Sequence, residues 1–195
     1  ALPNAISFKV AYRNIVQFCA GEEVSPPDEI NCFYINEGSI SSGTAVPIHT
    51  IGKHSFNEQI YLANEIDLPK TKIHSIAYKY INDTPISVQN IKIYMGNTDK
   101  TSFSSTSDWI TVDKMTEVFD GSINFLKSDD IWTVIEFDTP FQYDGFSNIV
   151  VAVCNNNGVE LPTGYNATFE GNKNDTNSSR VISYHNSTST EIDPN

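Results

Sequence analysis

The sequence predicts an all-β protein, a two-sheet antiparallel jelly-roll β-sandwich, and three observations carry the prediction. Many short segments alternate apolar and polar residues, with the period of two that is typical of strands. Turn residues separate these segments at spacings of roughly 8–12 residues, as in sandwich proteins. Only one short stretch has a helical pattern. The length of 195 residues favours a jelly roll over a seven-strand immunoglobulin module.

The first 30 residues differ in pattern from the rest of the chain. We expect strands over residues 6–12 and 15–19, followed by an acidic, proline-containing linker over residues 21–28. FKVAYRN followed by GEEVSPPDE resembles the closing strand and exit linker of a fibronectin type III module. We therefore divide the chain into residues 1–30, N-terminal strands and linker, and residues 31–195, the sandwich. The alternative is that residues 1–30 hold the first strands of the main domain.

From residue 31 the pattern is one of short strands joined by turns. We expect strands over residues 32–35, 56–61, 72–80 and 88–95, a loop over residues 36–44, and one helical turn over residues 63–66. A Ser/Thr-rich loop over residues 101–108 ends at Trp109, before a short strand over residues 110–112. Asp120-Gly121 is a hairpin-type dipeptide, so separate strands are expected on either side of it. The last strands cover residues 168–170 and 181–184, before a polar and loosely held tail.

Residues 131–154 are expected to supply the centre of the core. A strand over residues 132–137 alternates β-branched and aromatic residues, and Asp138-Thr139-Pro140 ends it. Tyr143-Asp144-Gly145 forms a turn. Residues 149–154 are an apolar run of strand length, and a strand that is apolar on both faces is covered on both sides. We expect Trp132, which opens the first strand, to be buried in the core.

Charge and cysteine content limit the classes of function. The formal net charge of −12 argues against binding to nucleic acid and to anionic membrane surfaces. No apolar run approaches the roughly 20 residues of a membrane span. Of the three cysteines, one pair, most simply Cys19–Cys32, leaves Cys154 as a buried free thiol.

Three phrases of the sequence resemble a known family more specifically. They are QIYLANEI (59–66), NIKIYMGNTDKTSFSSTSDWI (90–110) and WTVIEFDTPFQYDGFSNIVVAVCNNNG (132–158). Together they resemble a jelly-roll domain that recurs in large secreted and surface proteins of Bacteroidota, similar in architecture to MAM-like and cleaved-adhesin sandwiches. The resemblance implies a secreted or cell-surface, non-catalytic accessory module that acts in adhesion or glycan binding.

Aromatic residues in loops are the candidates for binding carbohydrate, because sugar rings stack on exposed aromatic faces. Trp109 follows the Ser/Thr-rich loop, Tyr143 sits in a turn, and Tyr165 lies between Gly164 and Asn166. We expect these three rings to be exposed. The alternative for Trp109 is that it caps the core where the long loop rejoins the sandwich.

Calcium is the expected cofactor, because loop carboxylates supply the oxygen ligands that it prefers. Asp108 and Asp144 are the residues that we select. Asp99, Asp129, Asp130 and Asp175 are further candidates, although the chain has no EF-hand-type loop. Jelly rolls of the resembled type often carry a structural calcium ion.

The sequence does not predict an enzyme. Its four histidines accompany no nucleophile motif, and Glu136 and Asp138, two apart on one strand, are expected on a solvated face. We therefore expect a non-catalytic extracellular module that binds a polysaccharide or glycan. The alternative is a protein–protein adhesion module or a structural subunit of a bacterial surface assembly.

Overall fold

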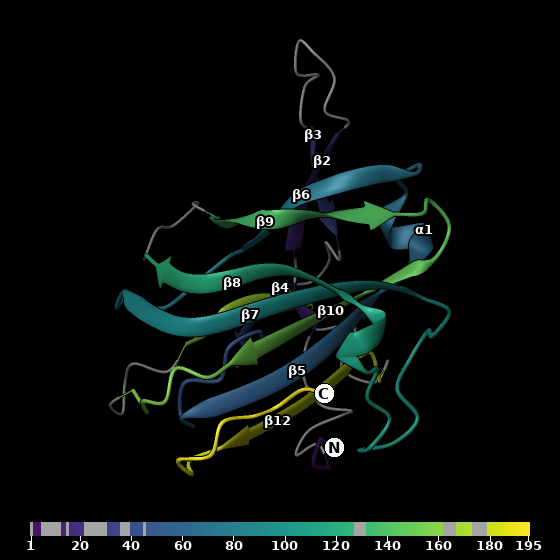
Figure 1. The fold of residues 1–195 in the computed structure, drawn as a ribbon. Coiled ribbons are helices and arrows are strands. Elements are labelled where there is room, and N and C mark those ends of the chain that lie inside the picture. The colour runs from purple at the N-terminus through teal and green to yellow at the C-terminus, as the bar shows by residue number, and fades with distance from the viewer. Residues whose placement is uncertain are drawn as a thin grey trace.

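The computed structural model describes residues 2–4, 13–14, 16–21, 31–35, 40–44, 46–126, 132–161, 167–172 and 179–195. Within these residues the protein is an antiparallel β-sandwich (Figure 1), which confirms the predicted all-β class. A five-stranded sheet has the order β12-β5-β10-β7-β8, and a four-stranded sheet has the order β3-β2-β6-β9. A third sheet, β1-β11-β4, accompanies the two expected ones. The jelly-roll connectivity stays a prediction.

The elements have the following bounds: β1 Arg13–Asn14, β2 Val16–Gly21, β3 Asn31–Ile35, β4 Ile40–Thr44, β5 His54–Tyr61, α1 Ala63–Ile66, β6 Thr71–Tyr78, β7 Ile86–Thr98, η1 Val112–Lys114, β8 Thr116–Phe125, β9 Thr133–Tyr143, β10 Asn148–Asn155, β11 Phe169–Asn172 and β12 Val181–Asn186. In the described part of the chain, no helix has the length and apolar character that crossing a membrane requires.

Strand β10 lies at the centre of the five-stranded sheet and is buried on both faces, as its apolar run predicted. Ile149, Val151 and Val153 belong to the main core between the large sheets. Ala152 and Cys154 belong to a second apolar cluster on the opposite face. A covered outer face is unusual for an antiparallel sheet, which commonly leaves one face to solvent. Other parts of the chain must therefore cover the outer face of this sheet.

Residues 13–21 are integral to the sandwich. Strand β2 lies between β3 and β6 in the four-stranded sheet, and Val16 and Phe18 are fully buried in the main core. Strand β1 pairs with β11, which lies near the other end of the chain. Strands β1 and β2 therefore pair with strands of the sandwich, and the division of the chain at residue 30 stays a prediction. The expected strand over residues 6–12 and most of the linker lie outside the described residues.

Two expected strand breaks are wrong. Asp120-Gly121 makes no hairpin; β8 runs straight through it, with Gly121 opposite Ile91. Strand β9 likewise continues through Pro140, where its register with β6 shifts between Ile73 and Ser75. Proline has no N–H to donate to a neighbouring strand. Because β9 is an edge strand, the sheet loses no hydrogen bond at Pro140, where the register is irregular.

Three other local expectations are also corrected. Residues 40–44, expected in a loop, form β4, and residues 112–114 form the 3₁₀ turn η1. The C-terminal tail is anchored, since Ile192 is buried and its backbone N–H and C=O bond the Asn156 side chain, each at 3.0 Å. Ile192 is one apolar residue in a polar tail, which is a weak signal in the sequence. It is buried because the fold brings it against an apolar cluster from distant parts of the chain.

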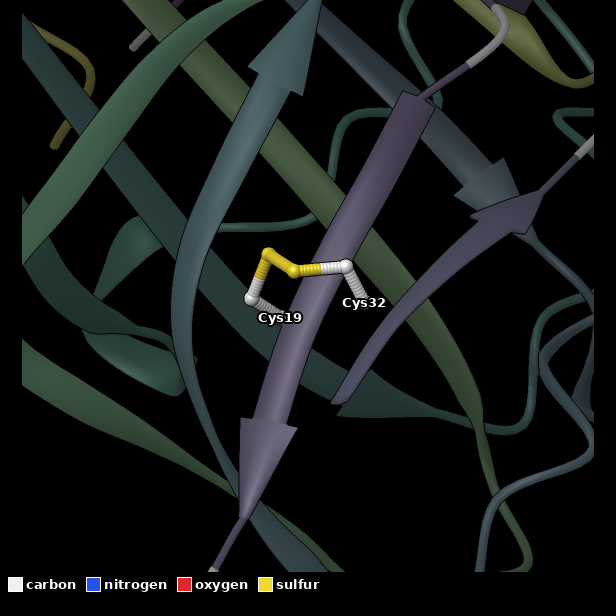
Figure 2. The surroundings of a disulfide bond; sticks show 2 residues. All are labelled: Cys19 and Cys32. Atoms are coloured by element: carbon white, nitrogen blue, oxygen red, sulfur yellow. A yellow bond between two sulfur atoms is a disulfide. The ribbon is translucent and has the colours of Figure 1, made fainter. Parts of the chain in front are cut away.

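The pair Cys19–Cys32 forms the disulfide, and Cys154 is a buried free thiol, as expected. Cys19 and Cys32 are directly opposite each other on β2 and β3 (Figure 2). Among the described residues β3 is an edge strand with β2 as its one partner, so the disulfide ties this edge to the rest of its sheet.

A buried charge network joins the sheets. The Arg13 side chain is fully buried and donates two hydrogen bonds of 2.7 Å to the Glu65 carboxylate. It also donates a 2.7 Å bond to the Ile60 carbonyl, and Arg180 donates to Glu65 at 2.8 Å. Burial acts to raise the pKa of Glu65, but the two guanidinium groups and the Leu62 N–H outweigh it and lower the pKa to about 2.

Replacing Glu65 tests this network. Because the folded-state pKa lies below the unfolded value, the stabilisation is present above about pH 4.5 and is lost as pH falls towards 2. We expect Glu65→Gln to lower the free energy of unfolding by roughly 3 kcal/mol at pH 7, because Arg13 loses its buried counter-charge. Urea denaturation from pH 2 to 7 measures this difference, which should narrow at low pH.

The matched control is Glu117→Gln, which removes an exposed ion pair with Lys92. Exposed pairs contribute about 0–1 kcal/mol, so this variant should unfold close to the wild type at every pH. Equal losses of stability in the two variants would contradict a special role for Glu65.

Candidate ligand-binding surfaces

Trp109 lies in a covering segment, residues 99–115, that crosses the outer face of the five-stranded sheet. Its half-buried ring packs against Phe56 of β5 with ring centroids 5.2 Å apart, and its indole N–H donates to the Pro3 carbonyl at 2.9 Å. Phe103 from the same segment is buried against Ile60 and Ile182. Trp109 therefore caps an apolar cluster rather than standing free as a flat platform.

Glu58 lies fully buried beneath the covering segment. Its Oε2 atom accepts the Ile110 N–H at 2.9 Å, while its Oε1 atom has no hydrogen-bond partner within the described part of the chain. Burial raises the pKa of Glu58 to about 8, against the smaller lowering effects of the Ile110 N–H and Lys100. Glu58 is therefore largely protonated at neutral pH, a state that the sequence pattern does not reveal.

Both carboxylate oxygens of Asp108 have partners within the covering segment. One carboxylate oxygen forms an ion pair with the Lys100 ammonium. The other accepts the Ser104 N–H at 2.8 Å and the Ser104 hydroxyl at 2.9 Å. A cation at Asp108 would have to displace Lys100. Asp108 thus organises the covering segment.

The turn after β9 forms as expected, but it buries its tyrosine. The prediction that Tyr143 is exposed is wrong, because the side chain is 1% exposed and its hydroxyl donates to the Ser147 carbonyl at 3.0 Å. The neighbouring Phe146 is instead 77% exposed. Alternation along β9 turns Tyr143 towards the core, and the turn then reverses the chain before Phe146.

Asp144 holds the shape of this turn. Its Oδ1 atom accepts the N–H groups of Phe146 and Ser147 at 3.0 and 2.9 Å. Slight burial acts to raise the pKa of Asp144, and the hydrogen bonds from Ser147 and Phe146 outweigh it and lower the pKa. Gly145 has φ of +89° and packs against the Lys70 backbone, so a side chain at this position would clash.

Most of the other predicted ligand residues cannot be placed. Tyr165, Asp129, Asp130 and Asp175 lie outside the described residues. In the ranges that are described, no group of three or more His, Cys, Asp or Glu side chains is placed to hold a metal ion. Calcium binding therefore stays a prediction.

The histidines and the paired acids occupy structural or exposed positions. The rings of His49 and His185 stack with centroids 3.8 Å apart, and burial together with His185 lowers the pKa of His49 to about 4. His74 Nε2 lies 3.0 Å from the Gly21 carbonyl oxygen. Glu136 and Asp138 are both exposed, as expected.

The most prominent aromatic surface involves two residues that the sequence analysis did not select. Tyr34 is 49% exposed, and its ring lies 5.3 Å from that of Trp132, with the ring planes inclined by 50°. Trp132 is half-buried, so its expected place in the core is wrong. Val134, 47% exposed, lies two residues further along. We call Tyr34, Trp132 and Val134 the aromatic surface.

Strand register places the aromatic surface on the outside of the four-stranded sheet. Ile35, Val16 and Tyr78 lie opposite one another on three neighbouring strands and are buried in the core. Tyr34, one residue earlier, therefore points outward in the same row as Val134. The disulfide lies in the next outward-facing row.

Tyr34 was not selected because it lies in a short strand, residues 32–35, in which every residue can be buried. Such a strand does not by itself show which of its faces meets solvent. Trp132 was assigned to the core because its strand was taken to be central. In the described residues β9 is an edge strand, and its Val134, Glu136 and Asp138 side chains are exposed. The one usable signal was alternation, which places Cys32 and Tyr34 together on the face opposite Phe33 and Ile35.

Comparisons with models of protein families, with curated proteins and with solved structures find no match to this chain. The resemblance to a jelly-roll domain of Bacteroidota surface proteins therefore stays a prediction. What can be argued about ligands depends on the geometry of the chain itself.

The buried carboxyl of Glu58 gives a test of how the covering segment is held. The pKa of Glu58 in the folded protein lies above the unfolded value of 4.5. Burying this carboxyl therefore costs the least stability below pH 4.5, where it is protonated in both states. Stability should fall as pH rises towards 8, because the unfolded chain ionises first. Glu58→Gln removes this penalty and should raise the free energy of unfolding by roughly 2–4 kcal/mol at pH 8–9.

Urea denaturation of both proteins between pH 5 and 9 measures the effect. Near pH 5, where Glu58 is protonated in the fold, the two curves should almost coincide. An advantage of the glutamine variant that does not grow with pH would show that Glu58 is not neutral beneath the segment.

Proposed function

We propose that this chain is a non-catalytic carbohydrate-binding module of a secreted or cell-surface protein. The observation that carries the proposal is the contact between the 49% exposed ring of Tyr34 and the half-buried ring of Trp132 on the outer face of the four-stranded sheet. Large exposed rings are costly on a surface without a ligand, and aromatic faces bind the C–H groups of sugars.

The geometry of the pair favours particular ligand shapes. The rings are inclined by 50°, so their faces do not form one plane. Such a surface suits a single sugar ring or a twisted glycan chain better than the flat face of a crystalline polysaccharide. Gln17 and Glu136 also point outward from this sheet, in the row of Tyr34 and in the next row, and can bond sugar hydroxyls.

Two further features support the extracellular setting. The Cys19–Cys32 disulfide is of a kind that persists in oxidising compartments. The net charge of −12 is compatible with a soluble module that avoids anionic surfaces.

A second candidate function is protein–protein adhesion, and Phe146 favours it. A ring that is 77% exposed, on a turn that Asp144 and Gly145 hold in shape, resembles an anchor for a protein partner. Phe146 follows the C-terminal end of β9, whereas Trp132 and Val134 of the aromatic surface lie at its N-terminal end, so the two candidates can be separated by substitution.

The test of carbohydrate binding begins with affinity electrophoresis in gels that contain soluble plant, fungal or host polysaccharides. Tyr34→Ala and Trp132→Ala should each weaken the retarding interaction by about tenfold, because each removes a stacking face. Phe146→Ala is the matched control and should bind as the wild type does. Wild-type migration unchanged in every gel, or equal binding by all four proteins, would contradict the proposal.

The disulfide should matter for this binding. Cys19→Ser with Cys32→Ser releases the edge strand β3, which bears Tyr34, from its covalent tie to β2. We expect affinity to fall several-fold, because the ligand must then order the strand. Thermal unfolding should show that the variant remains folded. Unchanged affinity would mean that pairing with β2 alone is enough to hold Tyr34 in place.

A further inference from the structure

A separate cleft lies on the opposite side of the sandwich, on the outer face of the five-stranded sheet. It has a volume of about 300 Å³ and is lined by Asn90, Lys92, Asp120, Cys154, Asn156 and Glu191. Its size is at the lower end of the range of small-ligand sites, about 300–1,000 Å³. The aromatic surface belongs to the other sheet and contributes nothing to it.

Directional bonds build the walls of this cleft. Asn156 lies where β10 ends, and its N–H donates to the Asn90 carbonyl at 3.0 Å. Its side-chain amide exchanges two 3.0 Å hydrogen bonds with the backbone of Ile192, which holds the C-terminal segment as one wall. Asn90 has φ of +54° at an irregularity of β7. The cleft is therefore preformed, and Asn156 is used in forming it.

The charged groups of the cleft disfavour an anionic ligand. The Lys92 ammonium lies 3.0 Å from the Asp120 carboxylate and 2.9 Å from that of Glu117. Two carboxylates, Asp120 and the exposed Glu191, therefore stand against one ammonium group that is already paired. At the floor, burial raises the pKa of Cys154 to about 12, so its thiol stays neutral and unreactive.

We propose that this cleft is a second binding site, for one neutral sugar residue. A hydroxyl group both donates and accepts, so it can donate to the carboxylates of Asp120 and Glu191 and accept from Lys92. The class of ligand is shared with the proposed function, but the residues are different. A module with sites on two faces could cross-link or follow a branched glycan, with gains in avidity over either site alone.

The test uses ¹H–¹⁵N NMR titration with methyl glycosides of glucose, galactose, mannose and xylose. At least one should shift the backbone amide signals of Asn90, Lys92, Asp120 and Asn156. Methyl glucuronide carries a negative charge, which Asp120 and Glu191 oppose, and should bind at least several-fold more weakly at these signals. Methyl glucosaminide carries the opposite charge on a similar ring and serves as the second charged probe. Absence of shifts with all four neutral glycosides, or tighter binding of either charged one, would overturn the proposal.

Two variants remove ligand contacts, and two controls separate the sites. Asp120→Asn and Glu191→Gln should each weaken binding at the cleft by about tenfold, through loss of a charged acceptor. Glu117→Gln, which removes the other partner of Lys92 but does not line the cleft, should change affinity by less than about twofold. Tyr34→Ala should leave the cleft signals unaffected.

The same variants distinguish failure of this proposal from failure of the proposed function. If polysaccharide retardation depends on Tyr34 while no cleft signal moves, the cleft proposal alone falls. If the cleft signals move and retardation is insensitive to Tyr34 and Trp132, the cleft proposal stands and the aromatic surface is not the site. Equal weakening by Glu117→Gln and Asp120→Asn would show that the charge on Lys92, rather than contact with the sugar, governs binding.

Discussion

The bond between Arg13 and Glu65 is the constraint on which the arrangement of the sheets depends. A fully buried guanidinium is tolerated only where its donors are matched, and here Glu65 and the Ile60 carbonyl match them. The ring of Tyr61 lies 4.7 Å from the same guanidinium carbon. One residue of the small sheet is thereby joined to α1 and β5, and Arg180 brings the start of β12 to the same carboxylate. In a chain with a net charge of −12, the buried Arg13 and the partly buried Arg180 thus share the carboxylate of Glu65.

The two large sheets differ in what covers their outer faces, and this difference decides where a ligand can bind. On the five-stranded sheet, the covering segment, Ile192 and the Trp109 ring bury most of the outward-facing side chains of β5 and β10. A polar cleft between β7, β8 and the C-terminal segment is open on this side. On the four-stranded sheet the aromatic surface is left open to solvent. A ligand can therefore stack on apolar rings at the four-stranded sheet. At the five-stranded sheet it can instead form hydrogen bonds through its hydroxyl groups.

The strand content and most strand positions could be predicted, because period-two patterns and turn residues are local properties of the chain. The breaks at Gly121 and Pro140 were mispredicted because cross-strand pairing overrides local propensity. Gly121 is held extended opposite Ile91, and Pro140 is tolerated because β9 is an edge strand. The candidate site was predicted less well, since exposure was inferred from turn-like surroundings. Tyr143 lies beside such a turn and is buried, whereas Tyr34 lies within a strand and is half exposed.

The sequence by itself determined the all-β class, the central position of the apolar strand β10, a turn beginning at Asp144-Gly145 and the simplest disulfide pairing. Each follows from residues close together in the chain or, for the disulfide, from the number and spacing of the cysteines. Only the tertiary structure decided which aromatic rings meet solvent, that the buried Glu58 has one unpaired oxygen within the described residues, and that the C-terminal segment forms one wall of a cleft. Alternation divides the residues of a strand between two faces, but whether a face is covered depends on segments far away in the sequence. That is why Trp109 and Trp132 exchanged the roles expected of them, one serving as a cap and the other facing outward.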